Sequence, residues 1–118
     1  MTQQRTVPRR NKSRAIKTTY RGRVYDSKLE ARYAQHLDLL IEARVIRGWI
    51  PQPERLPLVV NGTKIGVYTP DFKVFGMVND NWFVDTKGFI PKDWPFRLKV
   101  IRACYPHLDL RIVTSKDF

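Results

Sequence analysis

Apolar residues change their spacing several times along this chain, and this change excludes an all-helical or an all-strand fold. Between residues 28 and 45 they recur at helical intervals and form one stripe, made of Leu29, Tyr33, Leu37, Leu40, Ile41 and Val45. From Leu56 to Tyr68 they alternate on both sides of Asn61-Gly62, a pair that suits the two positive-φ positions of a tight hairpin turn. A helix followed by paired strands is therefore predicted.

Shorter signals predict the remaining elements and an α/β class. Residues 19–25 are typical of a small hairpin that turns at Arg21-Gly22. Gly48 and Pro51 are expected to close the first helical segment. The other predicted elements are strands at 72–75, 82–87 and 110–114 and a helix at 95–105, between Pro95 and Pro106.

The length and the composition exclude several classes of protein. The 118 residues suit a single domain, which can bury a core without disulfide or metal staples. Cys104 is the single cysteine, so an intramolecular disulfide and a Cys-based zinc site are excluded. No apolar run approaches the ~20 residues of a membrane helix, and the N-terminus lacks the apolar core of a signal peptide. We therefore expect a cytoplasmic protein with no membrane partner.

The net charge of +11 points to a polyanionic partner, most often nucleic acid. The first 25 residues contain no acid and eight basic residues: Arg5, Arg9, Arg10, Lys12, Arg14, Lys17, Arg21 and Arg23. We expect a flexible basic arm at residues 1–18, a single domain at 19–118, and contacts between these cations and phosphate. Lys99, on the second predicted helix, is a further candidate for a phosphate contact. The alternative for the arm is a solvated tail that only aids solubility.

Asp85-Thr86-Lys87 ends a predicted apolar strand and is the first candidate for chemistry. Because side chains alternate along a strand, Asp85 and Lys87 are expected on one face. A carboxylate that binds a hard divalent cation, beside an ammonium that orients water, suits phosphodiester hydrolysis. The alternative is an ordinary ion pair at the end of a sheet.

Asp71, which follows Pro70, begins the preceding strand. If the connecting loop is centred on Val78, antiparallel pairing places Asp71 opposite Asp85, close enough for both to bind one cation. If the loop is centred nearer Asp80, the pair is offset by about four residues. The sequence leaves both registers open.

Glu30 is the third acid, and two roles compete for it. Ser27 and Glu30 match a helix capping box, in which the Glu side chain bonds back to the backbone before the helix. Equally, Glu30 lies beside the apolar stripe and is a candidate for the catalytic site.

Together, Glu30 in an early helix, Pro70-Asp71 and Asp85-Thr86-Lys87 resemble the PD-(D/E)XK nuclease superfamily over about residues 19–118. The stretches at 25–33, 49–53 and 68–72 resemble a small phage-type branch, similar to Holliday-junction resolvases and to TnsA-type transposon-end endonucleases. The resemblance implies a restriction-endonuclease-like fold, with a mixed sheet of four or five strands flanked by helices.

The resemblance also implies roles for particular residues. Asp71, Asp85 and the Thr86 carbonyl would bind Mg²⁺ or Mn²⁺, and Lys87 would position the attacking water. Glu30 would hold a metal through water or complete a second site, and Gln52 would be accessory. The expected function is a metal-dependent DNA endonuclease, structure-specific for branched DNA and working as a homodimer, because resolving a junction needs two cuts.

Two other functions stay open on the sequence. A non-catalytic nucleic-acid-binding protein explains the net charge equally well but leaves the three acids without a role. A nuclease subunit that cuts only when a partner protein recruits it is the second alternative.

Overall fold

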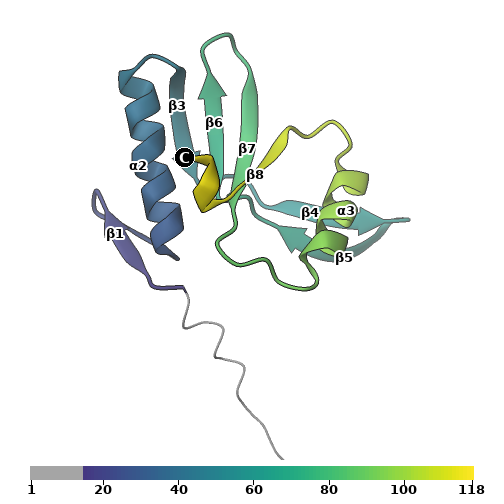
Figure 1. Ribbon diagram of the computed structural model, residues 1–118. Coiled ribbons are helices and arrows are strands. Elements are labelled where there is room, and N and C mark those ends of the chain that lie inside the picture. The colour runs from purple at the N-terminus through teal and green to yellow at the C-terminus, as the bar shows by residue number, and fades with distance from the viewer. Residues whose placement is uncertain (1–14) are drawn as a thin grey trace, which may run out of the picture.

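A four-stranded mixed sheet forms the centre of the protein in the computed structural model, which describes residues 15–118 (Figure 1). Its strands lie in the order β3 (Ile46–Pro51), β6 (Phe72–Gly76), β7 (Asn81–Thr86) and β8 (Leu110–Val113). The first two pairings are antiparallel, and β7 pairs with β8 in parallel. Helices flank this sheet, so the predicted α/β class is confirmed.

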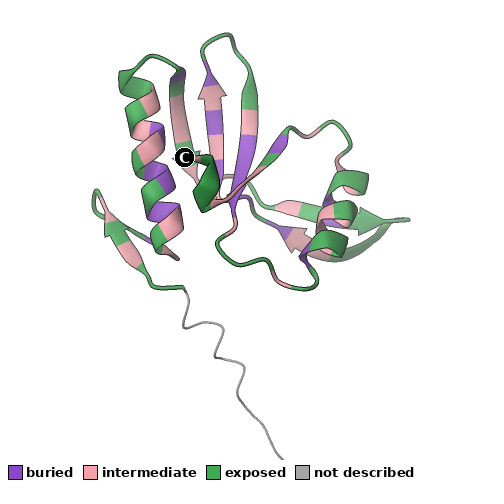
Figure 2. Cartoon of the chain, viewed as in Figure 1, coloured by how far each residue is buried: buried purple, intermediate pink, exposed green. Residues whose placement is uncertain are grey.

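The helix α2 (Lys28–Glu42) covers one face of the sheet and forms the first core. Its cap is Ser27, whose side chain accepts a hydrogen bond from the Glu30 N–H at 3.1 Å. Tyr33 and Leu37 of the predicted stripe are buried against strand residues such as Phe72. The helix ends before Val45, however, which is exposed, so the buried stripe is shorter than the apolar spacing predicted. Figure 2 shows the buried side of α2 turned toward the sheet.

A second core lies where the hairpin of β4 (Leu56–Val60) and β5 (Thr63–Tyr68) meets α3 (Trp94–Cys104). Phe83 from β7 and Leu110 from β8 join it, and because Val84 of β7 lies in the first core, β7 contributes to both cores. The predicted turn is confirmed, because Asn61 and Gly62 have φ angles of 51° and 79°. Such angles are open to Gly and Asn at little steric cost, which is why this pair can make the turn.

The small hairpin of β1 (Thr18–Tyr20) and β2 (Arg23–Tyr25) packs beside α2 and turns at Arg21-Gly22, as predicted. Asp38 on α2 connects this hairpin to the sheet. Its carboxylate accepts hydrogen bonds from the Tyr20 hydroxyl at 2.6 Å and from the Trp49 indole at 2.9 Å. The hairpin is thereby attached to the same helix that carries Glu30.

Strand β3 is the main element that the sequence prediction missed. Gly48 and Pro51 indicated the end of a segment, yet Gly48 pairs with Phe75 and Pro51 pairs with Phe72. Both residues are tolerated because β3 is an edge strand, where a missing N–H and a bulge between Ile46 and Gly48 do not interrupt a central ladder. A short 3₁₀ turn, η2 (Ser115–Asp117), follows β8.

Within residues 15–118, no helix is both long and apolar enough to span a membrane.

Candidate active site

The register of β6 and β7 places the two predicted aspartates opposite each other. Phe72 pairs with Val84 and Phe75 with Asn81, so the loop is centred on Val78 and the next residues outward are Asp71 and Asp85. This is the first of the two registers that the sequence left open. In an antiparallel pair, directly opposed side chains have Cβ atoms about 5 Å apart, which brings both carboxylates to one end of the sheet.

Backbone and side-chain contacts hold Asp71 in this position. Its Oδ2 accepts hydrogen bonds from the Thr86 backbone N–H at 2.8 Å and from the Thr86 hydroxyl at 2.9 Å. On its other side, the Asp71 carbonyl accepts a bond from the Gln52 N–H at 2.8 Å. Asp71 therefore bridges the end of β3 and the end of β7.

The backbone carbonyl of Thr86 faces β6 without a donor opposite it. The N–H groups of Phe83 and Lys87 point to β8, so those of Val84 and Thr86 point to β6. Continuing the register places Pro70 opposite Thr86, and proline has no N–H to donate. The proline of the motif thus leaves this carbonyl available as a ligand.

Lys87 lies alongside Asp85 at the end of β7. Its Nζ is 3.3 Å from Asp85 Oδ2, and the side chains of Asp85 and Lys87 are only 6% and 19% exposed. The ammonium also lies 3.9 Å from the centre of the Trp94 ring, a cation–π contact that holds it over α3. The ion pair that was the alternative reading is therefore present, but it is buried in a cavity with a second carboxylate.

Burial is the main reason why both aspartates have a pKa above the usual range of an aspartate. Burial and, after it, the neighbouring Asp71 raise the pKa of Asp85 to about 7, against the opposing effect of Lys87. Burial and, to a smaller extent, Glu30 raise the pKa of Asp71 to about 6, against the opposing effects of hydrogen bonds with Asp85 and Thr86. Two carboxylates with only one ammonium beside them leave uncompensated negative charge, which a divalent cation would neutralise.

Glu30 lies beside Asp71 and also serves the helix start, so the two proposed roles are compatible. Its Oε1 accepts the Asp26 backbone N–H at 3.0 Å, one residue before the Ser27 expected for an ideal capping box. At the same time its carboxyl group raises the pKa of Asp71 by hydrogen bonding and by charge. Glu30 is buried, so this acidic group is part of the site rather than of the surface.

A cavity of about 320 Å³ opens over these groups on the side of α3. Its lining brings the acids together with hydroxyl and cationic groups: Tyr68, Thr69, Asp71, Asp85, Lys87, Pro91, Asp93, Trp94 and Arg97. This cavity is where a substrate could meet Asp85 and Lys87 at once.

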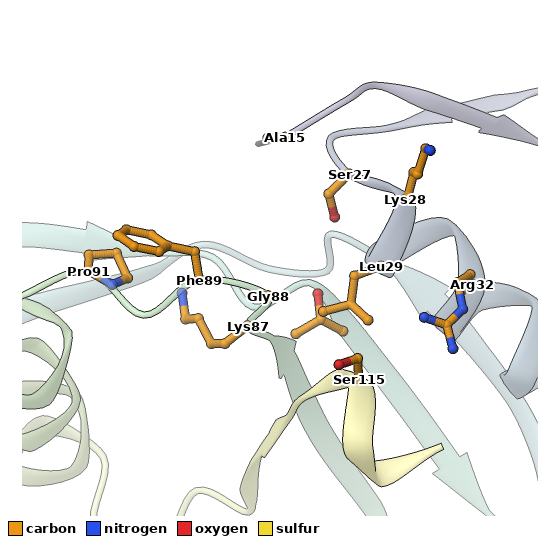
Figure 3. Close-up of a pocket in the computed structure, with 11 residues that line it drawn as sticks. Ala15, Ser27, Lys28, Leu29, Arg32, Lys87, Gly88, Phe89, Pro91 and Ser115 are labelled. Atoms are coloured by element: carbon orange, nitrogen blue, oxygen red, sulfur yellow. The ribbon is translucent and has the colours of Figure 1, made fainter. Parts of the chain in front are cut away.

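A second, basic hollow of about 480 Å³ adjoins the first and shares Lys87 and Pro91 with it. In Figure 3, Leu29 lies between Lys87 on one side and Arg32 of α2 on the other. Ala15, the first described residue, also lies among the residues around this hollow (Figure 3). At this end of the sheet, a cavity that contains the two aspartates therefore adjoins a hollow lined by basic side chains.

The donor set suits a hard divalent cation bound by two carboxylates and a carbonyl. Within residues 15–118, no cluster of three His, Cys, Asp or Glu side chains is arranged to hold a metal ion. The candidate ligands are thus Asp71, Asp85 and the Thr86 carbonyl, all oxygen atoms of the kind that Mg²⁺ prefers. Glu30, which bonds to the Asp26 N–H, would act on such a site through water.

The other predicted site residues lie at varied distances from this centre. Gln52 is held next to Asp71 by its backbone, whereas its side chain accepts a bond from Arg23 at 3.5 Å. Lys17 pairs with Asp26 at 3.0 Å, and Arg21 lies 3.5 Å from Asp38. Lys99 is exposed on α3. The remaining predicted DNA contacts lie outside the described residues: Arg5, Arg9, Arg10, Lys12 and Arg14.

The sequence did not indicate Tyr68, Lys28 and Arg32, which the fold brings to the two cavities, and it offered Arg97 only as one of three cations on the second predicted helix. Tyr68 stands three residues before Asp71, and this proximity was a usable signal. Arg97 comes from a helix far along the chain, and no local pattern indicates which face of α3 it occupies.

Comparison with known proteins identifies one family. The searches of curated proteins and of solved structures each found no match. A family model described as "Protein of unknown function (DUF1064)" matches residues 10–118 and so covers the whole site. The chain therefore belongs to the DUF1064 family.

Proposed function

We propose that this protein is a divalent-metal-dependent endodeoxyribonuclease that hydrolyses phosphodiester bonds in branched DNA. The observation that carries the proposal is the buried pairing of Asp71 with Asp85, with the Lys87 ammonium 3.3 Å from Asp85. These groups combine a site for a hard cation with a fixed positive charge, which is what phosphodiester hydrolysis needs.

Each group has a distinct role in this proposal. Asp71, Asp85 and the Thr86 carbonyl hold Mg²⁺ or Mn²⁺, which supplies Lewis acidity and a more acidic water when bound. Lys87, kept over the Trp94 ring, orients the attacking water and meets the negative charge that grows on the phosphate. Glu30 keeps a water in place through its carboxyl group while also capping α2.

The charge distribution disfavours a protein that only binds nucleic acid. Burying two carboxylates costs stability, and acids facing a polyanion weaken its binding. A protein that only binds nucleic acid gains nothing from buried carboxylates, whereas a metal site requires them and its cation reverses their charge. We further propose a homodimer, because a junction or a double-strand break needs two cuts and one copy offers one such site.

The test is a cleavage assay on a four-way junction, a linear duplex and a single strand, each with Mg²⁺, Mn²⁺ or EDTA. We expect metal-dependent cleavage with preference for the junction. Asp85→Asn is expected to abolish it, while Asp109→Asn, which removes a carboxylate from an exposed ion pair with Arg111, should cut like the wild type. Cleavage that survives Asp85→Asn would show that another site, or a contaminant, carries the activity.

Light scattering of the protein with and without junction DNA tests the dimer.

If the wild type binds the junction but cuts no substrate in any metal, the non-catalytic alternative replaces the proposal.

A further inference from the structure

The hydroxyl group of Tyr68 is the one polar side-chain atom, among the described residues, that is fully buried without a hydrogen-bond partner. Tyr68 ends β5 and is 4% exposed. A buried hydroxyl that makes no hydrogen bond destabilises the fold, and such groups are rare in folded proteins. A phenylalanine would fill the same space without this cost, so the hydroxyl calls for an explanation.

Tyr68 is one of the residues that line the cavity of Asp85, Lys87 and Arg97, and its hydroxyl is buried beside that cavity. Asp85 is its acidic neighbour in this cavity, but no group of the described residues meets the hydroxyl at both hydrogen-bond distance and angle. A phenol has an ordinary pKa of about 10, so at neutral pH it donates or accepts a hydrogen bond as a neutral group.

Arg97, on α3, places a second hydrogen-bond donor in the lining of the same cavity. Its Nη2 donates to the Val67 carbonyl at 2.7 Å, which fixes the guanidinium next to Tyr68. A guanidinium carries five N–H donors, so this bond leaves others to the cavity. Tyr68, Arg97 and Lys87 thus present donors, whereas Asp71 and Asp85 present acceptors.

The geometry points to an anion-binding wall, formed by Tyr68 and Arg97, that donates hydrogen bonds to a non-bridging oxygen of the scissile phosphodiester. The inference rests on the proposed function, since the ligand is that of the proposed nuclease. A phosphodiester suits this wall because its non-bridging oxygens only accept hydrogen bonds, and a donor set that includes a cation binds them strongly. Base edges mix donors with acceptors and fit it less well.

Tyr68→Phe removes only the hydroxyl and is the decisive variant. We expect kcat/KM for cleavage to fall about 10- to 100-fold, the loss of one hydrogen bond to a charged ligand. The free protein should melt at a higher temperature than the wild type, because an unpaired buried hydroxyl is gone. The shift in melting temperature caused by Mn²⁺ alone should be unchanged, because the phenol is no metal ligand.

Tyr105→Phe is the matched control. The Tyr105 hydroxyl already donates to the Pro57 carbonyl at 2.6 Å and lies outside the cavity. Its loss should lower the melting temperature slightly and leave kcat/KM unchanged.

Two outcomes overturn the inference. If Tyr68→Phe lowers the melting temperature and weakens the Mn²⁺ shift, the hydroxyl supports Asp85 rather than the phosphate. If it leaves kcat/KM unchanged, the hydroxyl has no role in substrate binding.

A separate readout distinguishes this inference from the proposed function. The dinucleotide d(TpT), which offers one phosphodiester, is added with Mn²⁺ to wild type, Tyr68→Phe and Arg97→Lys. If the wild type cuts no DNA but d(TpT) raises its melting temperature and not that of Tyr68→Phe, the nuclease proposal fails and the anion-binding wall stands. If d(TpT) shifts both proteins equally, the wall is wrong even where cleavage is observed.

Discussion

At the scale of single residues, the fold buries two carboxyl groups side by side, so ionising Asp71 and Asp85 lowers the stability of the free protein. Asp71 and Asp85 both have a raised pKa, and burial is the first cause for each. Such local conflicts are expected at functional sites, where the fold accommodates groups that a ligand later compensates. These raised pKa values make the unfolding free energy of the free protein depend on pH.

Asp85→Asn should stabilise the free protein more at pH 8 than at pH 5. Because the folded-state pKa of Asp85 is raised to about 7, its contribution to stability is fully present below the unfolded pKa and is lost as the pH rises through about 7. Asparagine does not titrate, so the difference in unfolding free energy between variant and wild type should grow over this range. Urea denaturation at several pH values measures it, and a difference that is constant with pH would contradict the assignment of Asp85 as the titrating group.

Glu30→Gln separates the two roles of Glu30. A glutamine oxygen can still accept the Asp26 N–H bond at the helix start, so we expect a folded protein with little change in melting temperature. The carboxylate next to Asp71 is lost, so cleavage should fall strongly. Circular dichroism melting and the junction assay are run on the same preparation. Near-normal cleavage would leave Glu30 with the structural role alone.

At the scale of elements, α2 does more than cover the sheet. Its first turn presents Glu30 to the site, and Asp38, two turns later, accepts hydrogen bonds from Tyr20 of β1 and Trp49 of β3. The helix therefore couples the hairpin and the edge strand to the end of the sheet where the aspartates lie.

Asp38→Ala should lower the melting temperature, because the Tyr20 hydroxyl and the Trp49 indole lose their acceptor. Because Asp38 does not line either cavity, cleavage at saturating protein and well below the melting temperature should persist. Asp109→Ala, which breaks an exposed ion pair worth at most about 1 kcal/mol, is the control. An equal loss of stability in both variants would show that Asp38 does not connect these elements.

At the scale of the whole molecule, the charge is arranged in two adjoining zones. The acidic cavity with Asp71 and Asp85 meets the basic hollow lined by Lys28 and Arg32, and Ala15 lies at the rim of the basic one. The basic residues before Ala15 lie outside the described residues, and their contact with phosphate stays a prediction.

Deleting residues 1–14 tests that prediction. The segment contains five cations and no acid. Each phosphate neutralised adds about 0.9 to the log–log slope of affinity against salt, so the deletion should reduce the slope by roughly two to four units. Cleavage at saturating protein should survive, because all proposed catalytic residues lie beyond the deletion. Binding titrations at several salt concentrations measure the slope, and an unchanged slope would make the segment a bystander.

The sequence alone determined the features that depend on near neighbours. The turns at Arg21-Gly22 and Asn61-Gly62, the start of α2 at Ser27 and the class of the fold follow from local backbone preferences and apolar spacing. The order of the acids along the chain also indicated the candidate site before any geometry was known.

Tertiary structure decided what depends on distant partners. The register that opposes Asp71 and Asp85 is set in the loop, where the Gly76 N–H bonds to the Asp80 carbonyl at 2.7 Å and the Asp80 side chain occupies the space that a Cβ at residue 76 would need. Strand β3 forms because the edge of the sheet accepts its proline and its bulge. Tyr68 and Arg97 meet only when α3 packs on the β4–β5 hairpin. Cross-strand register and packing between elements join residues far apart in the chain, and local patterns contain no record of such contacts.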